Sequence, residues 1–388
     1  MAEPTIRFRG FDDEWEQRKL GDVAQEFKSG NSLKADEIDI TGDYPVYGGN
    51  GLRGYTSTYN HDGEYALIGR QGALCGNMNY SAGKAYFTEH AVVVKADENN
   101  DTRFLYYMLD TMNLGQYSDQ SAQPGLAVNK LVKLENSFPK KEEQQQIGAY
   151  FRSLDHLITL HQRKCDETKK LKKYMLQKMF PQNGSKVPEI RFKGFTDEWE
   201  QRKLGELSEK TFGGGTPKTS NESFWKGNIP WIQSSDLIEG SLFDVEPRKY
   251  ISQEAVDKSA TKLVPENSVA IVTRVGVGKL AFMPFSYATS QDFLSLSVLK
   301  TEPKFTVYAL YKKLQSELNA VQGTSIKGVT KDELLAKKVM IPCYKEQEKI
   351  GSYLHSLDHL ITLHQHKCEE LKKLKKFMLQ NMFTQKNK

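Results

Sequence analysis

The chain repeats itself in two places, and these repeats limit what it can fold into. Residues 6–23 read IRFRGFDDEWEQRKLGDV, and residues 190–207 read IRFKGFTDEWEQRKLGEL. Further along, residues 147–180 return at 350–383 with scattered differences. A duplication of this kind predicts two similar structural units rather than one irregular domain.

The segments between the repeated blocks differ from each other. Residues 24–137, which we call module 1, scarcely resemble residues 208–340, which we call module 2. The layout is therefore constant, variable, constant, twice over. We interpret it as one scaffold that is used twice to hold two different modules. A duplicated enzyme would more naturally keep its chemistry in the similar parts.

The constant blocks 140–180 and 344–388 have the pattern of long helices. Apolar residues recur at alternating spacings of four and three, as in a coiled-coil seam. Each helix has one broad apolar stripe, so we expect the two to pack as an antiparallel pair with an approximate two-fold axis. The pair either only holds the chain together or is a spacer that also docks other subunits. The seam consists of Ile147, Phe151, Leu154, Ile158, Ile350, Leu354, Leu357 and Ile361, widened by Leu157, Leu160 and Leu171.

A histidine and a cysteine recur near the middle of each helix. His161 and Cys165 are four residues apart, and so are His364 and Cys368. Two histidines and two cysteines could bind zinc tetrahedrally. Alternatively they form a polar layer of the seam that sets the register of the helices. The sequence favours the seam layer and predicts no metal.

The sequence contains no convincing catalytic signature. The string RVGVGKLA at 274–281 lacks the first glycine and the hydroxyl residue of a phosphate-binding loop. Asp155–His156 and Asp358–His359 suggest an acid–base pair, but neighbours on a helix do not face each other. A solvated or partner-facing patch is the favoured interpretation of both. We therefore expect a chain that performs no catalysis and binds no cofactor.

Composition narrows the class of protein further. No apolar run in the 388 residues approaches the roughly 18 that a membrane span needs, and the N-terminus has no apolar signal core. Four cysteines are too few for a disulfide scaffold, so we expect a cytoplasmic protein without membrane association. The basic excess lies in the helical blocks, whereas module 1 has nine basic and fourteen acidic residues.

Both modules have the pattern of mixed α/β domains. Short apolar runs lie between glycine-rich turns, and each module has one stretch typical of a helix. The predicted fold class is α+β, with two mixed α/β domains separated by two long antiparallel coiled-coil helices in pseudo-two-fold symmetry. The predicted boundaries are 1–139 and 190–343 for the two domains, 140–180 and 344–388 for the helices, and 181–189 for a linker.

Two arginines and two glycine-rich loops are candidate contacts to a ligand. Arg70 and Arg274 occupy the same place in a shared pattern, A-[LI]-[IV]-[GT]-R-[QV]-G. Such an arginine could bind phosphate or pair with guanine, or it could form a structural salt bridge. The loops VYGGNGLRGY (46–55) and TFGGGTPKTS (211–220) would let backbone N–H groups approach phosphates, unless they are plain turns.

The whole layout resembles the specificity subunit of type I restriction–modification systems. The resemblance rests on the paired openings [IV]-R-F-[RK]-G-F at 6–11 and 190–195 and on the entries P-x-x-x-E-Q-x-x-I-G that precede both helices. It also rests on GGGTPKT (213–219) followed by FWKGNIPWI (224–232), which is similar to the opening of that family's target recognition domains.

The resemblance implies a DNA-binding subunit of a larger complex. Each domain would be a target recognition domain that reads one half of a bipartite double-stranded DNA site. The helices would set the distance between half-sites and dock two methyltransferase subunits, which carry S-adenosylmethionine; motor-nuclease subunits would join through these. The DNA-binding residues would be Tyr47, Gly49, Asn50, Arg53, Arg70, Gln71, Glu89, His90, Gln123, Gly214, Thr216, Lys218, Ser234, Ser235, Arg274, Gln291, Asp292, Ser325 and Lys327.

A protein of another class remains the alternative. A coiled-coil adaptor with two ligand-binding modules would have the same repeats and the same helices. Such an adaptor would show no salt-sensitive DNA binding, even when it is assembled with its partners.

Overall fold

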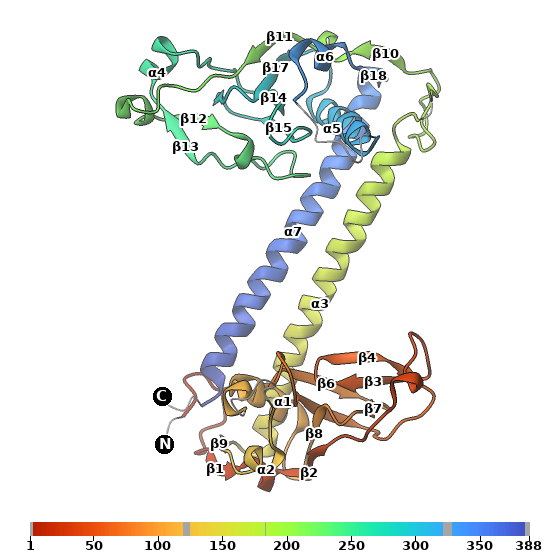
Figure 1. Ribbon diagram of the computed structural model, residues 1–388, viewed down its shortest axis with the longest axis vertical. Helices are drawn as coiled ribbons and strands as arrows, with labels where there is room; N and C mark the ends of the chain where they lie inside the picture. The colour runs from red at the N-terminus through yellow and green to blue at the C-terminus, as the bar shows by residue number, and fades with distance from the viewer. Residues whose placement is uncertain (1–2, 119–124, 183, 321–327, 385–388) are drawn as a thin grey trace. The chain divides into compact units, whose positions relative to one another are not determined.

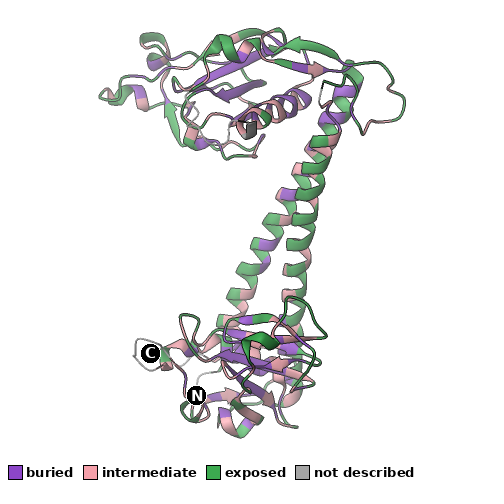
Figure 2. Ribbon diagram, turned by 45° about the vertical axis from the view of Figure 1, so that its right-hand side comes forward, coloured by how far each residue is buried: buried purple, intermediate pink, exposed green. Residues whose placement is uncertain are grey.

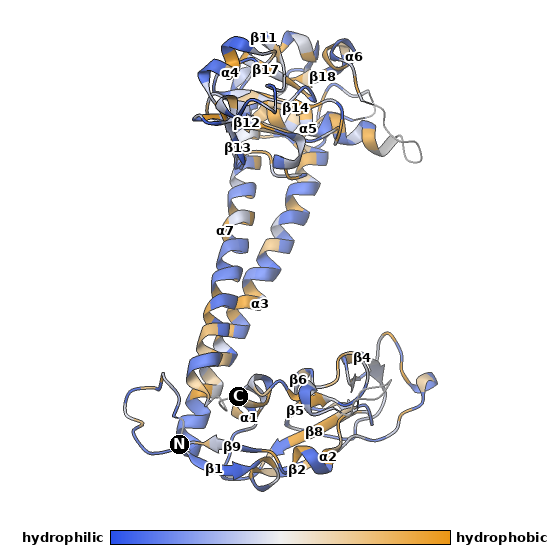
Figure 3. Cartoon of the chain, turned by 60° about the vertical axis from the view of Figure 1, so that its left-hand side comes forward, coloured by the Kyte–Doolittle hydropathy of each residue, from blue (hydrophilic) through white to orange (hydrophobic). Residues whose placement is uncertain are grey.

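The heptad pattern forms two long helices, α3 (Lys141–Lys178) and α7 (Tyr344–Met382), in the computed structural model of the protein (Figure 1). Both helices are predominantly hydrophilic along their length, with apolar residues at intervals (Figure 3). The structure describes residues 3–118, 125–182, 184–320 and 328–384.

The chain divides into two units, and the division falls within both long helices. Unit 1 is Met1–Arg163 with His364–Lys388, and unit 2 is Lys164–Leu363. Each unit therefore contains one module, the first half of one long helix and the second half of the other.

Module 1 is built from two sheets. The first has the order β2-β8-β5-β6 and consists of β2 (Ala24–Ser29), β8 (Ala91–Ala96), β5 (Glu64–Gly69) and β6 (Met78–Ala82). The second has the order β4-β3-β7, with β4 (Gly51–Thr56) antiparallel and β7 (Tyr86–Phe87) parallel to β3 (Tyr44–Gly48). A two-stranded ribbon pairs β1 (Glu16–Lys19) of the repeated opening block with β9 (Glu135–Phe138) at the end of the module.

Module 2 has the same topology although its sequence differs. Its first sheet has the order β11-β17-β14-β15, from β11 (Ser208–Gly213), β17 (Phe293–Leu299), β14 (Ser268–Val272) and β15 (Leu280–Met283). Its second has the order β13-β12-β16, from β13 (Lys249–Ile251), β12 (Ile229–Ile232) and β16 (Ala288–Thr289). The matching ribbon pairs β10 (Glu200–Lys203) of the second opening block with β18 (Lys338–Ile341) at the end of the module.

One helix packs on the first sheet of each module. These helices are α1 (Thr102–Thr111) in module 1 and α5 (Pro303–Ala320) in module 2. The other helices are short: α2 (Val128–Leu131), α4 (Gln253–Lys258) and α6 (Lys331–Ala336), with 3-10 turns at Leu20–Val23, Ala35–Glu37, Leu114–Tyr117, Leu204–Glu206, Glu222–Trp225 and Ser234–Asp236. The predicted mixed α/β class with two repeated domains is thus confirmed.

The predicted seam positions lie inside the units. In unit 1, the ring of Phe383 contacts Phe151 of α3 and Phe104 of α1, and the ring centroids are 5.7 and 5.3 Å apart, respectively. In unit 2, Phe180 stacks on Phe305 of α5 at 5.5 Å. Buried residues accordingly recur along the long helices (Figure 2). These side chains join each module to its helices, so they cannot themselves form a surface for docking. The eight are Ile147, Phe151, Leu154, Ile158, Ile350, Leu354, Leu357 and Ile361, of which only Ile158 is half-buried.

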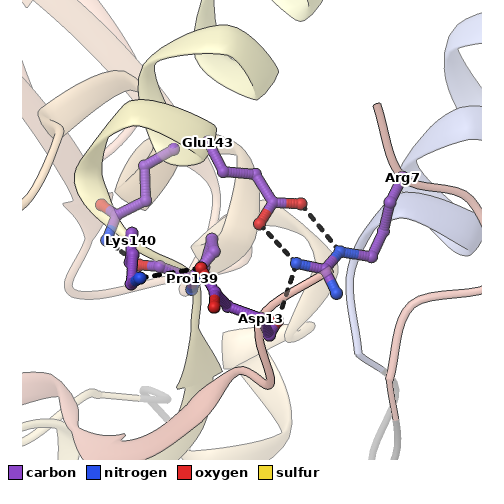
Figure 4. A network of polar contacts seen from close by, with 6 residues as sticks. Arg7, Asp13, Pro139, Lys140 and Glu143 are labelled. Atoms are coloured by element: carbon purple, nitrogen blue, oxygen red, sulfur yellow. Dashed lines mark hydrogen bonds and ion pairs between the residues drawn. The ribbon is translucent and has the colours of Figure 1, made fainter. Parts of the chain in front are cut away.

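An ion pair explains why the opening motif and the helix entry are both repeated. The Arg7 guanidinium donates to both carboxylate oxygens of Glu143, at 3.0 and 2.8 Å, and to the carbonyl of Asp13 at 2.8 Å (Figure 4). In the same network, the Lys140 ammonium pairs with the Asp13 carboxylate at 2.8 Å. The ion pair of unit 2 has the same geometry, with Arg191 donating to both oxygens of Glu346 at 2.7 and 2.8 Å.

The glutamine that follows each of these glutamates links the start of the long helix to the module by hydrogen bonds. Gln144 donates to the Pro139 carbonyl at 2.8 Å and accepts from the N–H of Asp101 at 2.9 Å. Gln347 makes the matching bonds to Pro342 and Glu302, also at 2.8 and 2.9 Å. The motif P-x-x-x-E-Q therefore encodes an attachment of the module to the long helix.

A glycine in each long helix permits the close approach of the module helix. A Cβ atom built on Gly351 would lie 2.7 Å from the backbone nitrogen of Phe305. We expect Gly351→Ala to destabilise unit 2, although the same change in an exposed helix interior stabilises by about 1 kcal/mol. Thermal unfolding of the variant checks this. Ser352→Ala, at the exposed next position, is the control, and a stabilised Gly351→Ala variant would contradict the prediction.

Candidate recognition surfaces of the two modules

Three connections of module 1 meet at one edge and bring the predicted residues together. The N–H of Arg70, directly after β5, donates to the His90 carbonyl at 2.9 Å. The Arg70 guanidinium lies 3.5 Å from the Glu89 carbonyl, and the His90 Nδ1 lies 3.1 Å from Gln71 Oε1. Four of the candidates therefore form one polar cluster between β5 and the β7–β8 connection.

The turn between β3 and β4 borders this cluster. A Cβ on Gly49 would come within 3.0 Å of the His90 carbonyl, so the absent side chain permits this approach. Tyr47 accepts a backbone hydrogen bond from Thr88 at 2.9 Å, and the exposed Asn50 and Arg53 follow in the same turn and in β4. Gln123 lies outside the described residues, two positions before Gly125, which pairs with Gln71.

Module 2 has a groove at the corresponding edge, with a volume of about 870 Å³. The predicted residues Arg274 and Gln291 line it, and both are exposed. Gly214 lies beside it, where a Cβ would collide with the Ser290 carbonyl. The Ser290 hydroxyl in turn lies 3.3 Å from the carboxylate of Asp292.

Among the described residues, the remaining predicted contacts of module 2 do not line this groove. Ser234 accepts a bond from Lys279 through its carbonyl at 3.4 Å, and Ser235 is exposed beside it. Thr216 is exposed. The carbonyl of Lys218 accepts a hydrogen bond at 3.4 Å from the indole of Trp225, which packs against the apolar residues of the second sheet. Ser325 and Lys327 lie outside the described residues.

Arg70 and Arg274 do not occupy equivalent positions, which corrects the sequence match. In module 1, Arg70 donates to the His90 carbonyl and accepts from the N–H of Leu126, both at 2.9 Å. In module 2, Thr273 makes the two equivalent bonds, to Asp292 and from Val329, both at 2.7 Å. Arg274 therefore occupies the position that Gln71 has in module 1.

The number of residues between the strand and the glycine of the pattern explains this correction. The N–H of Gly69 bonds to Asn77 at 2.8 Å in module 1, and that of Val272 bonds to Lys279 at 2.9 Å in module 2. The glycine of the shared pattern is the third residue after Gly69 in module 1 but the fourth after Val272 in module 2, so a pattern aligned on this glycine is displaced by one residue relative to the strand. In a strand, such a displacement moves a side chain to the other face.

The groove residues that the sequence analysis missed include two at a helix start. Thr330 and Lys331 line the groove of module 2 at the start of α6. Thr330 and Glu333 form a capping box, with the Glu333 carboxylate 2.9 Å from the N–H of Thr330. The string T-K-D-E is a recognisable signature of a helix start, and it could have placed this helix beside Gly328.

Apolar side chains are exposed at corresponding positions of the long helices in both units. Leu157, Leu374 and Phe377 are exposed in unit 1, the last with 53 % of its surface accessible. The corresponding residues of unit 2, Leu360, Leu171 and Tyr174, are exposed as well, together with Leu363. The expectation that Leu157 and Leu171 widen the seam was wrong, because both face outward; Leu160 is half-buried.

The histidines and cysteines of the helices lie at the predicted seam. In unit 1, the Nδ1 atoms of His161 and His364 are 3.0 Å apart, and Cys368 donates to the Ile158 carbonyl at 4.0 Å. In unit 2, Cys165 donates to the Ile361 carbonyl at 3.9 Å. Among the residues described, no three histidine, cysteine or acidic side chains gather as a metal site would require.

The fold is that of a specificity subunit. The crystal structure of a type I restriction-modification system S subunit from M. genitalium is similar over 99 % of this chain and 100 % of that one, with a TM-score of 0.70 and 14 % identity. A chain from a structural study of complex assembly and conformational transition of the type I R-M system covers 96 % of this chain and 98 % of its own, with a TM-score of 0.52 and 19 % identity.

The sequence comparison places the chain in a family. The type I restriction modification DNA specificity domain matches residues 12–170 and again 196–373, and the chain belongs to this family. It is 42 % identical to the type I restriction enzyme EcoprrI specificity subunit of Escherichia coli over 156 residues, which is 39 % of each chain. It is 22 % identical to the putative MjaX specificity subunit of Methanocaldococcus jannaschii over 96 % of this chain and 94 % of that one.

The alignment with the EcoprrI subunit covers 39 % of that protein, which is well under two thirds of its length.

No described helix is both long enough and apolar enough to cross a membrane.

Proposed function

We propose that the chain is the DNA-specificity subunit of a type I restriction–modification complex. Each module recognises one half of a bipartite double-stranded target, and the chain performs no catalysis. Two methyltransferase subunits dock on the long helices and bring S-adenosylmethionine, and motor-nuclease subunits join through them. The assembly works in the cytoplasm, and this chain binds no cofactor.

The observation that carries this proposal is the difference between two modules of one topology. The corresponding positions hold Arg70 and Gln71 in module 1 but Thr273 and Arg274 in module 2. Arginine prefers guanine and glutamine prefers adenine at base edges in the major groove. One scaffold with different polar groups at matching positions is what the recognition of two different half-sites requires.

The exposed apolar positions of the long helices support the docking of two partner subunits. Contiguous exposed apolar surface marks interaction sites. Because Leu374 and Phe377 in unit 1 correspond to Leu171 and Tyr174 in unit 2, each unit offers a similar surface. A methyltransferase subunit that binds one of them would also bind the other.

The acidic balance of module 1 departs from what is expected of a DNA-binding domain, and it implies that tight DNA binding needs the assembled complex. Module 1 is acidic, with nine basic and fourteen acidic residues, so alone it offers little attraction to phosphates. The methyltransferase subunits would supply the missing positive charge around the DNA.

Mapping of methylated adenines tests the proposal. The chain would be co-expressed with its neighbouring methyltransferase gene product, and modified adenines would be located across the host genome by single-molecule sequencing. A bipartite motif with a fixed unspecified gap is the expected result. A contiguous motif would mean that one module is silent. A stable complex without any methylation would favour an inactive specificity subunit or the coiled-coil adaptor.

Replacement of the two arginines should affect different half-sites. We expect Arg70→Ala to weaken recognition of one half-site and Arg274→Ala that of the other, each by about 1–3 kcal/mol if the arginine pairs with a base. Competition binding of the assembled complex to targets with either half-site replaced measures this. Arg202→Ala, outside both modules, is the control. Equal losses on all sequences would indicate phosphate contacts instead.

A further inference from the structure

One carboxylate in unit 1 joins three helices. The Tyr107 hydroxyl, on α1 of the module, donates to one oxygen of Asp155 on α3 at 2.7 Å. The Lys375 ammonium, on α7, pairs with the other oxygen at 2.6 Å and also lies 5.2 Å from the centre of the Tyr107 ring. We call these three residues joint 1. Asp155 is thus neither an acid–base partner of His156 nor simply solvated.

Unit 2 contains the same arrangement. Tyr308 on α5 donates to one oxygen of Asp358 on α7, and Lys172 on α3 pairs with the other. The Lys172 ammonium lies 5.5 Å from the centre of the Tyr308 ring. We call these three residues joint 2. The aspartates and lysines of both joints belong to the constant blocks, whereas the tyrosines belong to the variable modules.

The chemistry of the joints is suited to fixing the orientation of each module on its long helices. The hydrophobic effect is not directional, so burial of the apolar cores defines the angle of the module less sharply than hydrogen bonds do. Hydrogen bonds to a carboxylate are directional, and those that involve charged groups are the strong ones. Burial and the neighbouring aspartate raise the pKa of Tyr107 and Tyr308, so both hydroxyls stay protonated donors at neutral pH.

The two modules differ almost everywhere else, yet both place a tyrosine at this point. Tyr107 follows Phe104 by three residues, and Tyr308 follows Phe305 by three, with both phenylalanines buried in the cores. A module that is to fit this scaffold must therefore present a hydroxyl to the helix aspartate.

We propose that joints 1 and 2 fix the direction in which each module faces from its helices, and thereby select the gap length between the half-sites. Their six residues are positioning residues, which touch no DNA. This inference rests on the proposed function. Helix length would set the approximate distance between half-sites, and the orientation fixed by the joints would select one gap length over gaps that differ by a base pair.

The test uses the full chain assembled with its methyltransferase subunits. Initial rates of methyl transfer are compared on a target with the natural gap and on targets whose gap is one base pair longer or shorter. We expect Tyr107→Phe and Lys375→Met to lower the preference for the natural gap by roughly three- to tenfold, the usual size of coupling within such a network. Tyr308→Phe and Lys172→Met should act alike through joint 2.

Matched variants separate positioning from stability. Tyr106→Phe and Lys373→Met remove the same groups from neighbouring positions of α1 and α7 and should leave the preference unchanged. Lys375→Arg keeps the positive charge that Lys375→Met removes, so it should retain most of the preference for the natural gap. If the joint variants lose activity equally on all gap lengths, with a lower melting temperature, the joints only stabilise the fold and the proposal is wrong.

A second measurement does not depend on DNA. Spin labels at Ser57 in module 1 and Glu369 on α7, both exposed, report the direction of module 1 after Cys343→Ser and Cys75→Ala remove accessible thiols. The distance distribution should broaden in Tyr107→Phe, and an unchanged distribution overturns the joint. If the wild-type complex does not methylate gapped targets, the proposed function fails instead, so the two failures are distinguishable.

Discussion

Arg191→Met is expected to lower the free energy of unfolding of unit 2 by about 3–5 kcal/mol, the range for breaking a buried ion pair from one side. The Glu346 side chain is wholly buried, and Arg191 donates to both of its oxygens. Methionine fills much of the same space but leaves the carboxylate charged and without its partner. The ion pair also ties the opening of the second half to the start of α7, so its loss should loosen both.

Tryptophan fluorescence during urea unfolding measures this effect. Trp199, Trp225 and Trp231 lie in unit 2, whereas Trp15 lies in unit 1, so selective replacement of these residues assigns each transition. The double variant Arg191→Met with Glu346→Leu should recover much of the stability, because no buried charge remains.

An exposed ion pair of the same unit provides the control. Arg202 pairs with Glu200 at 2.7 Å, and both side chains are exposed. Arg202→Met should cost less than about 1 kcal/mol, as is usual for surface pairs. A loss of the same small size for Arg191→Met would mean that water reaches the Glu346 carboxylate in the variant.

Insertion of seven residues into both long helices is expected to lengthen the recognised gap by about three base pairs. Seven residues add about 10.5 Å to a helix, and one base pair adds about 3.4 Å along DNA. A full heptad preserves the seam, so the apolar stripes still face each other. The natural points are after Arg163 and after Leu363, where the chain passes between the units.

Methylation of targets with systematically varied gaps measures the result. The natural target should lose most of its methylation, and a target with the longer gap should gain it. Insertion into α3 alone displaces the two stripes and should abolish activity on every target. If the double insertion leaves the preferred gap unchanged, the helices do not set the distance between half-sites.

The sequence predicted the scaffold better than the surfaces that it carries. Heptad spacing identified seam residues such as Phe151 and Leu354 because helical periodicity is local, and both are buried. It did not separate Leu157 from the seam, because an apolar side chain at the edge of a stripe can face either way until its neighbours are placed. The ion pair of Arg7 and Glu143 was not foreseen, since it joins positions 136 residues apart.

The recognition surfaces show where the sequence became insufficient. A shared pattern made Arg70 and Arg274 look equivalent, yet backbone hydrogen bonds place Thr273 at the position of Arg70. The length of a connection and the register of a strand decide which side chain faces the groove, and neither follows from a local pattern.

By itself the sequence determined that one scaffold is used twice, that two long helices form its constant part and that the modules differ, because repeats and periodicity are written along the chain. Only the tertiary structure decided that the modules share one topology, that Asp155 and Asp358 each join three helices, and which polar groups face outward. Those features depend on contacts between residues far apart in the chain, which form only when burial of the apolar cores brings them together.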